Sequence, residues 1–303
     1  MPVSVQHMTR QQRETLDFFD RTAEAWNAKV DERAGERVNV IAQRNAYTLH
    51  VVSGRPEMRR ALDVGCGVGD LCIELARRGI RTTGLDFAPK MIEIAGRRLA
   101  ESPVTGLDFH AKDIFEFPLE KEAYDLIVAN GFIEYVSFAQ RDLFFSLALE
   151  ALSPDGSLVI SSRNRLFNLF SMNSFTEQEM AEGALEGLVL ESAAWVQGET
   201  VDTMLGHEAA ALPKEDIMHA DTGVGVKTRY QYTPVQLLQL LGAAGYGAEG
   251  VSPIHIHGVL PAFKEAQPAV HVCIANALQK FAIENHVLLP QASAFMVHVR
   301  KRA

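Results

Sequence analysis

Residues 60–70 read Arg-Ala-Leu-Asp-Val-Gly-Cys-Gly-Val-Gly-Asp, and this stretch decides the class of fold. Ala61, Leu62 and Val64 are apolar, and with Asp63 between them they predict a short buried strand. The glycines at 65, 67 and 69 allow the backbone to turn and to approach a ligand closely, because no Cβ is in the way. An apolar stripe over residues 71–76 then predicts a helix whose free N–H groups point toward the same space.

A carboxylate follows at the interval that a nucleoside-binding site requires. Asp86 ends the next expected strand, residues 81–85, where it can accept hydrogen bonds from both ribose hydroxyls. The glycine pattern is G-x-G-x-G, and Asp70 stands where G-x-G-x-x-G would have its last glycine. A pyrophosphate would be repelled by Asp70, whereas a ligand with a sulfonium and an ammonium group would tolerate it. A glycine-rich turn without any ligand is the alternative.

Strand and helix patterns alternate through most of the remaining chain. This order predicts an α/β fold with a doubly wound, seven-stranded, mostly parallel sheet of the Rossmann-like type and right-handed crossovers. A turn is expected at Ser153-Pro154-Asp155-Gly156. The other expected strands are residues 107–110, 124–129, 158–161, 248–256 and 294–300, and the other expected helices lie near 89–101, 143–151 and 234–244.

Four segments follow from this pattern. Residues 1–55 are predicted to form an N-terminal helical cap, which begins with a capping box at Thr9 and Gln12 and includes a second helix from about 36 to 51. Residues 56–162 form the cofactor-binding α/β core, and residues 163–232, which lack a steady period, form a lid and acceptor insertion. Residues 233–303 complete the core around a second insertion at about 257–291. A decorative surface insertion is the alternative to the lid.

Composition narrows the class of partner. No apolar run approaches the ~20 residues that a bilayer requires, and residues 1–13 lack a secretory pattern. The three cysteines have neither disulfide nor zinc spacing, so a cytoplasmic protein is expected. The net charge of −9 argues against a nucleic-acid surface and leaves small molecules and proteins as partners. A homo-oligomer is neither indicated nor excluded.

Four motifs in order resemble the class I S-adenosylmethionine-dependent methyltransferases of the small-molecule type. They are Leu62-Asp63-Val64-Gly65-Cys66-Gly67-Val68-Gly69, Gly84-Leu85-Asp86-Phe87-Ala88-Pro89-Lys90-Met91, Ala111-Lys112-Asp113-Ile114 and Leu152-Ser153-Pro154-Asp155-Gly156-Ser157-Leu158. The resemblance covers roughly residues 60–162 and resumes weakly at 232–252. It implies S-adenosyl-L-methionine as the cofactor.

The resemblance also implies which residues hold that cofactor. The three glycines would approach its methionine half, Asp86 would hold the ribose, and Asn130 would lie near the sulfonium. Asp113 would accept from the adenine amino group, although a cap of the loop before Phe115 is the alternative, and a simple strand-end turn is the alternative for Asn130. The full expected set is Asp63, Gly65, Cys66, Gly67, Gly69, Asp86, Phe87, Asp113, Ile114 and Asn130.

The acceptor site is expected beyond the carboxyl ends of the strands. The fourth strand lacks the Asn-Pro-Pro-Tyr or Asp-Pro-Pro-Tyr motif of enzymes that methylate nucleobase amino groups. In its place, residues 131–136 are similar to small-molecule members of the family. Glu134 and Tyr135 could contact the cofactor or the acceptor, or could instead cap the next helix.

Basic residues after the fifth strand could bind an anionic group of the acceptor. Arg163, Asn164 and Arg165 come directly after that strand, and Arg229 lies at the far end of the lid insertion. Solvated charges beside acidic lid residues are the alternative interpretation.

His255 and His257 alternate on a strand end, so both side chains should face one side. They could supply a general base or two metal ligands. Without a nearby acid the pair is a weak signal, ordinary packing or surface histidines are favoured, and no metal is predicted.

The sequence therefore predicts transfer of a methyl group from S-adenosylmethionine to oxygen, nitrogen or carbon of a small molecule, with an anionic acceptor as one option. A protein or RNA methyltransferase and a non-catalytic S-adenosylmethionine-binding protein are the alternatives. An oxidoreductase is a further, less favoured alternative.

Overall fold

The computed structural model describes the chain except residues 1–8, 32–36, 215–225, 227–229, 284 and 303. Seven strands form one sheet in the order β3-β2-β1-β4-β5-β7-β6. Strands β1 to β5 are parallel to their neighbours, and β7 lies antiparallel between β5 and β6. The strands are β1 Arg60–Val64, β2 Arg81–Asp86, β3 Leu107–Ala111, β4 Tyr124–Ala129, β5 Leu152–Arg163, β6 Tyr246–Ile256 and β7 Ala292–Lys301. The predicted seven-stranded, mostly parallel sheet is confirmed.

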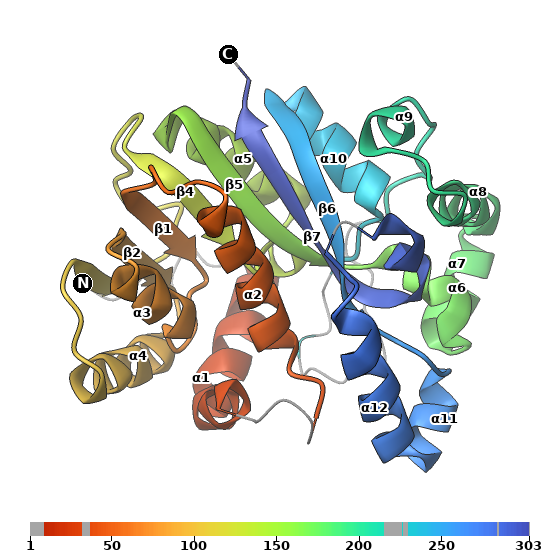
Figure 1. Cartoon of the computed structure of the whole chain (residues 1–303), viewed down its shortest axis with the longest axis horizontal. Helices are drawn as coiled ribbons and strands as arrows, with labels where there is room; N and C mark the ends of the chain where they lie inside the picture. Colours follow the sequence, from red (N-terminus) through yellow and green to blue (C-terminus); the bar gives the residue numbers. More distant parts are fainter. Residues whose placement is uncertain (1–8, 32–36, 215–225, 227–229, 284, 303) are drawn as a thin grey trace.

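Helices cover both faces of this sheet (Figure 1). Several begin where the sequence predicts, since Thr9 with Gln12 and Thr233 with Gln236 form capping boxes, and Pro89 and Pro234 occupy first-turn positions. The α-helices are α1 Arg10–Val30, α2 Val40–Ser53, α3 Asp70–Arg77, α4 Pro89–Glu101, α5 Phe138–Ala151, α6 Asn168–Ser171, α7 Ser174–Ala181, α8 Leu185–Val196, α9 Val201–Leu205, α10 Pro234–Ala243, α11 Pro261–Ala266 and α12 Pro268–Gln279. Short 3₁₀ helices are η2 Ile133–Tyr135, η3 Arg165–Phe167 and η4 His286–Gln291.

The two-residue period of the strands divides the core into two layers. On β4, Ile127 and Ala129 belong to the apolar cluster that includes residues of α5, α8 and α10. Leu126 and Val128 belong to the opposite cluster, which includes residues of α2 and α3. The strand is therefore buried on both faces, as its continuous apolar run predicts.

One local expectation is wrong. The predicted turn at Ser153-Pro154-Asp155-Gly156 lies inside β5, which begins at Leu152. The register against β4 passes from Leu152 directly to Ser157, so the four residues form an irregular segment within the strand.

The described part of residues 163–232 contains η3 and α6–α9 and buries Trp195 and Met204 in the core. This part of the insertion is therefore packed against the sheet domain.

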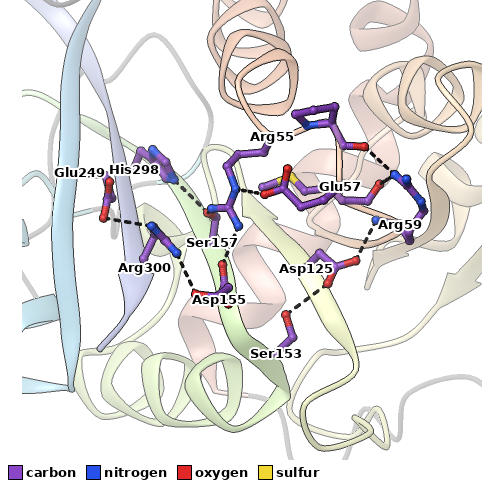
Figure 2. Close-up of polar contacts among 12 residues, drawn as sticks. Arg55, Glu57, Arg59, Asp125, Ser153, Asp155, Ser157, Glu249, His298 and Arg300 are labelled. Carbon is purple, nitrogen blue, oxygen red and sulfur yellow. Dashed lines mark hydrogen bonds and ion pairs between the residues drawn. The ribbon is translucent and has the colours of Figure 1, made fainter. Parts of the chain in front are cut away.

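A polar network explains why the chain of β5 bulges at this point (Figure 2). The guanidinium of Arg55 donates to the carbonyl oxygen of Asp155 over 3.0 Å, and Arg300 pairs with the Asp155 carboxylate at 2.9 Å. At the neighbouring strand, Asp125 accepts hydrogen bonds from the backbone N–H groups of Arg59 and Arg60 at 2.7 and 3.0 Å. These bonds satisfy backbone groups at the amino-terminal edge of the parallel strands.

In the described ranges, no helix combines the length and apolar character that crossing a membrane would require.

We expect Asp125→Ala to lower the free energy of unfolding by about 1–3 kcal/mol, because the partly buried N–H of Arg60 and the exposed N–H of Arg59 lose their acceptor. Asp155→Ala is the matched control, since its side chain is 83% exposed and only pairs with Arg300, and should change stability by less than about 1 kcal/mol. Urea unfolding measures both, and equal losses for the two variants would contradict the network.

Candidate functional site

A cavity lies at the carboxyl-terminal edge of β1, β2 and β4. Its floor consists of the glycine turn after β1, the end of β2 and the segment after β4, and its sides include residues of α1 and α2. The location is the one that parallel sheets use for ligands.

The glycine turn is hydrogen-bonded to the neighbouring strand. The N–H groups of Gly65 and Cys66 both donate to the carbonyl oxygen of Leu85, at 2.8 and 2.9 Å. Gly65 and Gly67 have φ values of +71° and +55°, a region that favours glycine. No atom lies within 4 Å of the position that a Cβ on Gly67 would take, so the backbone there is open to the cavity.

Gly69 differs from the other two glycines. It lies at φ +77° before α3 and is absent from the cavity wall. A Cβ there would stand 2.4 Å from Cζ of Phe109, so this glycine is required for packing against β3. That Gly69 contacts the ligand stays a prediction.

Asp86 ends β2 with both carboxylate oxygens held by backbone. Oδ2 accepts from Gly67 N and Oδ1 from Ala88 N, each at 2.9 Å. Burial raises the pKa of this carboxyl to about 6. The side chain thus connects the glycine turn to the start of α4. Its remaining lone pairs and the ring of the neighbouring Phe87 face the cavity.

Two further carboxylates line the same wall. Burial raises the pKa of Asp63 to about 7, although Cys72 Sγ donates to its Oδ2 at 3.3 Å. Burial also raises the pKa of Asp70, whose Oδ2 accepts from the side-chain amide of Asn45. Since desolvation penalises all three charges, the wall is suited to a cationic ligand that would compensate it.

Cys66 also lines the cavity, and burial raises the pKa of its thiol to about 11. The thiol is therefore protonated at neutral pH and supplies a weakly polar surface, not a nucleophile.

Asp113 sits at the opposite end, next to Ile114 in the wall. Its Oδ1 accepts from Phe115 N and its Oδ2 from the side-chain amide of Gln12, both at 3.1 Å. The first bond is the loop cap that the sequence allowed as an alternative, and the second ties α1 to the cavity. Gln12 was not predicted to belong to the site, since its capping role was its only signal.

Asn130 ends β4 and lines the cavity with both side-chain polar atoms buried. Neither Nδ2 nor Oδ1 has a hydrogen-bond partner among the described residues. A buried amide without partners is costly, so the cavity contains a donor and an acceptor available to a ligand.

The N-terminal helices contribute most of what the sequence did not reveal. Phe19, Trp26 and Val30 of α1 line the cavity with Ile41 and Arg44 of α2. The apolar stripe of α1 was visible in the sequence, but its period could not distinguish a packing face from a ligand-facing one.

Glu134 and Tyr135 have different positions relative to the cavity. Tyr135 lines the cavity and packs edge-on against Phe19, with ring centroids 5.4 Å apart. Glu134 is 2% exposed and lies between Arg44 at 3.6 Å and Arg163 at 3.4 Å. Its carboxylate therefore orients two arginines and does not itself line the cavity, and neither residue caps α5, which begins at the Ser137 capping box.

The polar side chains that follow β5 mostly bind other parts of the protein. Arg165 is buried in a bidentate pair with Glu179, at 2.9 and 2.7 Å. Asn164 donates to the carbonyl oxygens of Leu289 and Ala292. These bonds occupy polar groups of both side chains, and acceptor binding by Asn164 and Arg165 stays a prediction. The alternative placed solvated charges beside acidic residues of the insertion; Arg165 does pair with the acidic Glu179, but it is buried and not solvated. Arg163 stays a prediction, and Arg229 lies outside the described residues.

None of the described residues of 163–232 lines the cavity, so a lid formed by this segment stays a prediction. His255 and His257 face one side as predicted, with ring centroids 4.3 Å apart, but they too are absent from the cavity wall.

Comparisons with known proteins agree with this geometry. A family model described as "Methyltransferase domain" matches residues 57–211, just over half of the chain. The ubiquinone biosynthesis O-methyltransferase of Bradyrhizobium diazoefficiens is 27% identical over 172 residues, which cover 52% of this chain and 64% of the relative. The match thus spans less than two thirds of that relative's own length.

Solved structures extend the likeness over nearly the whole chain. The [4+2]-cyclase SpnF has a TM-score of 0.57 at 18% identity and covers 97% of both chains. Magnesium protoporphyrin IX methyltransferase (ChlM) from Synechocystis PCC 6803 has a TM-score of 0.56 at 14% identity, covering 96% of this chain and 100% of the other. At these identities the likeness concerns the fold alone.

We expect Gly69→Ala to lower the free energy of unfolding by about 2–5 kcal/mol, which combines left-handed strain of about 1–2 kcal/mol with overpacking of about 1–3 kcal/mol. Gly67→Ala is the matched control, because it carries similar backbone strain but its Cβ meets no protein atom. Denaturant unfolding should therefore give the larger loss for Gly69→Ala, and the reverse order would refute the packing role of this glycine.

Proposed function

Because the chain belongs to the methyltransferase domain family, we propose that it transfers a methyl group from S-adenosyl-L-methionine to a small-molecule acceptor. The observation that carries the proposal is the group of three buried carboxylates, Asp63, Asp70 and Asp86, around an open glycine turn. A sulfonium and an ammonium group are the cationic features that would offset their desolvation.

The described residues fit this cofactor along its length. Asp63, Asp70 and the turn at Gly65–Gly67 would receive the methionine half, and Asp86 would accept from the ribose hydroxyls. Asp113 and Ile114 lie where the adenine would end. When bound, the cofactor supplies a methyl group already activated on sulfur, so the protein has only to align the acceptor and exclude water.

The acceptor would lie where the cap meets the end of β4. Phe19, Trp26, Ile41 and Tyr135 present aromatic and apolar surface there, which favours a small molecule with an apolar body. Such a site also excludes water from the reacting atoms. The relative named for ubiquinone biosynthesis is consistent with an acceptor of this kind.

Arg44 would bind an anionic or strongly polar group of the acceptor. It lines the cavity, and its Nε has no hydrogen-bond partner among the described residues. Burial lowers the pKa of this guanidinium, while Glu134 raises it by supplying a countercharge. Arg44 thus joins Arg163, which stays a prediction, as a candidate to bind an anionic group of the acceptor.

The remaining assignments are supported by charge and by cysteine chemistry. A net charge of −9 disfavours a nucleic-acid acceptor. The cysteines at 66, 72 and 273 are all free thiols, which favours action in a reducing compartment such as the cytosol.

Calorimetry with S-adenosylhomocysteine tests the cofactor assignment. Asp86→Asn should weaken binding about 10- to 150-fold, because it removes a charged acceptor worth about 1.5–3 kcal/mol. Asp108→Asn, an exposed carboxylate on β3, is the control and should leave binding unchanged. Absence of binding by the native protein would overturn the proposal, and binding without methyl transfer across a broad acceptor panel would favour a non-catalytic protein.

Affinity for the cationic cofactor should depend on pH. The raised pKa values of Asp86, about 6, and Asp63, about 7, mean that both carboxylates gain protons as the pH falls through that window. Affinity for S-adenosylmethionine should therefore fall roughly 10- to 30-fold between about pH 8 and pH 5, since unit charges about 8 Å apart interact by about 2 kcal/mol at an effective dielectric of about 20.

S-adenosylhomocysteine is the matched ligand, because it differs only by the lost methyl group and the sulfonium charge that goes with it, and its affinity should change less with pH. If the affinities for the two ligands fell equally with pH, the proposed electrostatic role of the carboxylates would be refuted.

A further inference from the structure

Three histidines converge outside the cavity. His255 and His257 come from the end of β6 and the residue that follows it, and His271 comes from the first turn of α12. One ring nitrogen of each lies within 4.8 Å of one from each of the others. Only His255 and His257 formed a recognisable motif in the sequence, because it is the fold that brings His271 next to them.

The spacing suits a shared tetrahedral ion. Nε2 of His255 and Nε2 of His271 are 3.2 Å apart. Two ligands at the Zn–N distance of about 2.0–2.1 Å would be about 3.3–3.4 Å apart in a tetrahedron. The ring of His257 stands 4.3 Å from that of His255 and 4.8 Å from that of His271, centroid to centroid. A small rotation of the third ring would complete the set.

Within the described part of the chain, these rings have unsatisfied nitrogens. His257 is 8% exposed, and neither Nδ1 nor Nε2 has a hydrogen-bond partner. Nδ1 of His271, a residue 2% exposed, also has none. Buried polar atoms that are left without a partner are costly, so a packing role alone does not account for a polar cluster of this kind.

His255 is held as a metal-binding histidine usually is. Its Nδ1 lies 3.0 Å from Oγ of Ser293, a contact that can fix the tautomer and leave the Nε2 lone pair facing His271. Its backbone has a φ of +53°, uncommon for a residue with a side chain, and its N–H donates to the side chain of Gln43 at 2.9 Å. Strain of this type concentrates at functional sites.

We propose that His255, His257 and His271 bind one first-row transition-metal ion of the Zn²⁺ class, with a fourth coordination position open to an exogenous ligand. Imidazole ligands select such ions over Mg²⁺ and Ca²⁺, which prefer oxygen. Three protein ligands and one open position are the pattern of reactive zinc sites, whereas structural sites are closed by four.

The protonation state of the cluster agrees with this assignment. Burial lowers the pKa of all three histidines, that of His257 to about 3, so the rings are neutral at physiological pH, as metal ligands must be. Lys264 and Arg163 are the charged side chains that act on His255, and no carboxylate does. We therefore expect the open position to take an anionic oxygen ligand.

The site lies one layer of side chains away from the cavity. Gln43, which holds His255, adjoins Arg44 in the cavity wall. Arg163, which acts on His255, and Arg44 share the carboxylate of Glu134. β6 is parallel to β5, so the histidines lie at the same carboxyl-terminal edge as the cavity.

Zinc binding to tag-free protein tests the proposal. Chelator-treated, dialysed protein is titrated with ZnCl₂ in a calorimeter, and bound metal is counted by mass spectrometry. We expect one Zn²⁺ per chain and a rise in Tm on binding. His257→Phe should abolish both, since it keeps a ring against Phe167, at 4.4 Å between centroids, but removes the nitrogens. Ser293→Ala should weaken binding about 10- to 100-fold through the lost orientation of His255.

His50→Ala provides the control, because it removes an exposed histidine of α2 and should bind zinc as the native protein does. Circular dichroism establishes that each variant is folded, and His271→Ala replaces His257→Phe if the latter is not. The assignment would be overturned if the native protein bound no zinc. It would also be overturned if the histidine substitution and Ser293→Ala both left zinc binding unchanged, because the cluster would then be a hydrogen-bonded histidine pair only.

Discussion

The carbonyl oxygen of Leu85 is the acceptor on which the site depends. It receives the N–H groups of Gly65 and Cys66 and so holds the turn after β1 against the end of β2. One residue later, Asp86 accepts from Gly67 and completes the connection. Because the glycine turn lies in the left-handed region, these bonds fix a backbone that few other residues could adopt. The direction of α3, the opening of the cavity and the positions of the carboxylates all follow from this attachment.

The two edges of the sheet use polar groups in opposite ways. At the amino-terminal edge, Asp125 accepts hydrogen bonds from two backbone N–H groups, and the exposed carboxylate of Asp155 pairs with Arg300. At the carboxyl-terminal edge, Asn130 and the nitrogens of His257 lack partners in the described structure. These groups, which could bind a ligand, therefore lie away from the bonds of Asp125. This separation allows binding groups to be left unsatisfied without loss of the sheet.

Local rules predicted the elements well and the assembled site only in part. The glycine turn and the capping box at Thr9 carry their structural meaning within four or five residues, so the sequence sufficed. Gln12 reaches Asp113 across 101 positions, and His271 meets His255 across 16 through the packing of α12 on β6. The periodicity of a sequence gives no signal for such contacts. The pairing of Arg165 with Glu179 was not predicted, because Glu179 lies in a stretch whose helical structure the sequence pattern did not reveal.

The attachment of α1 has a consequence for how molecules enter and leave. Its polar contacts include Gln12 with Asp113, Asp20 accepting from Lys90 N, and Asp31 with Arg98, the last two of which are exposed. Exposed charged pairs contribute at most about 1 kcal/mol each and weaken with salt. The helix also packs apolar side chains against α4, so lifting it would break those contacts but would leave the hydrogen bonds between the strands intact. Exchange of product for fresh substrate would proceed by local opening under α1, at a rate that depends on ionic strength while the sheet stays closed.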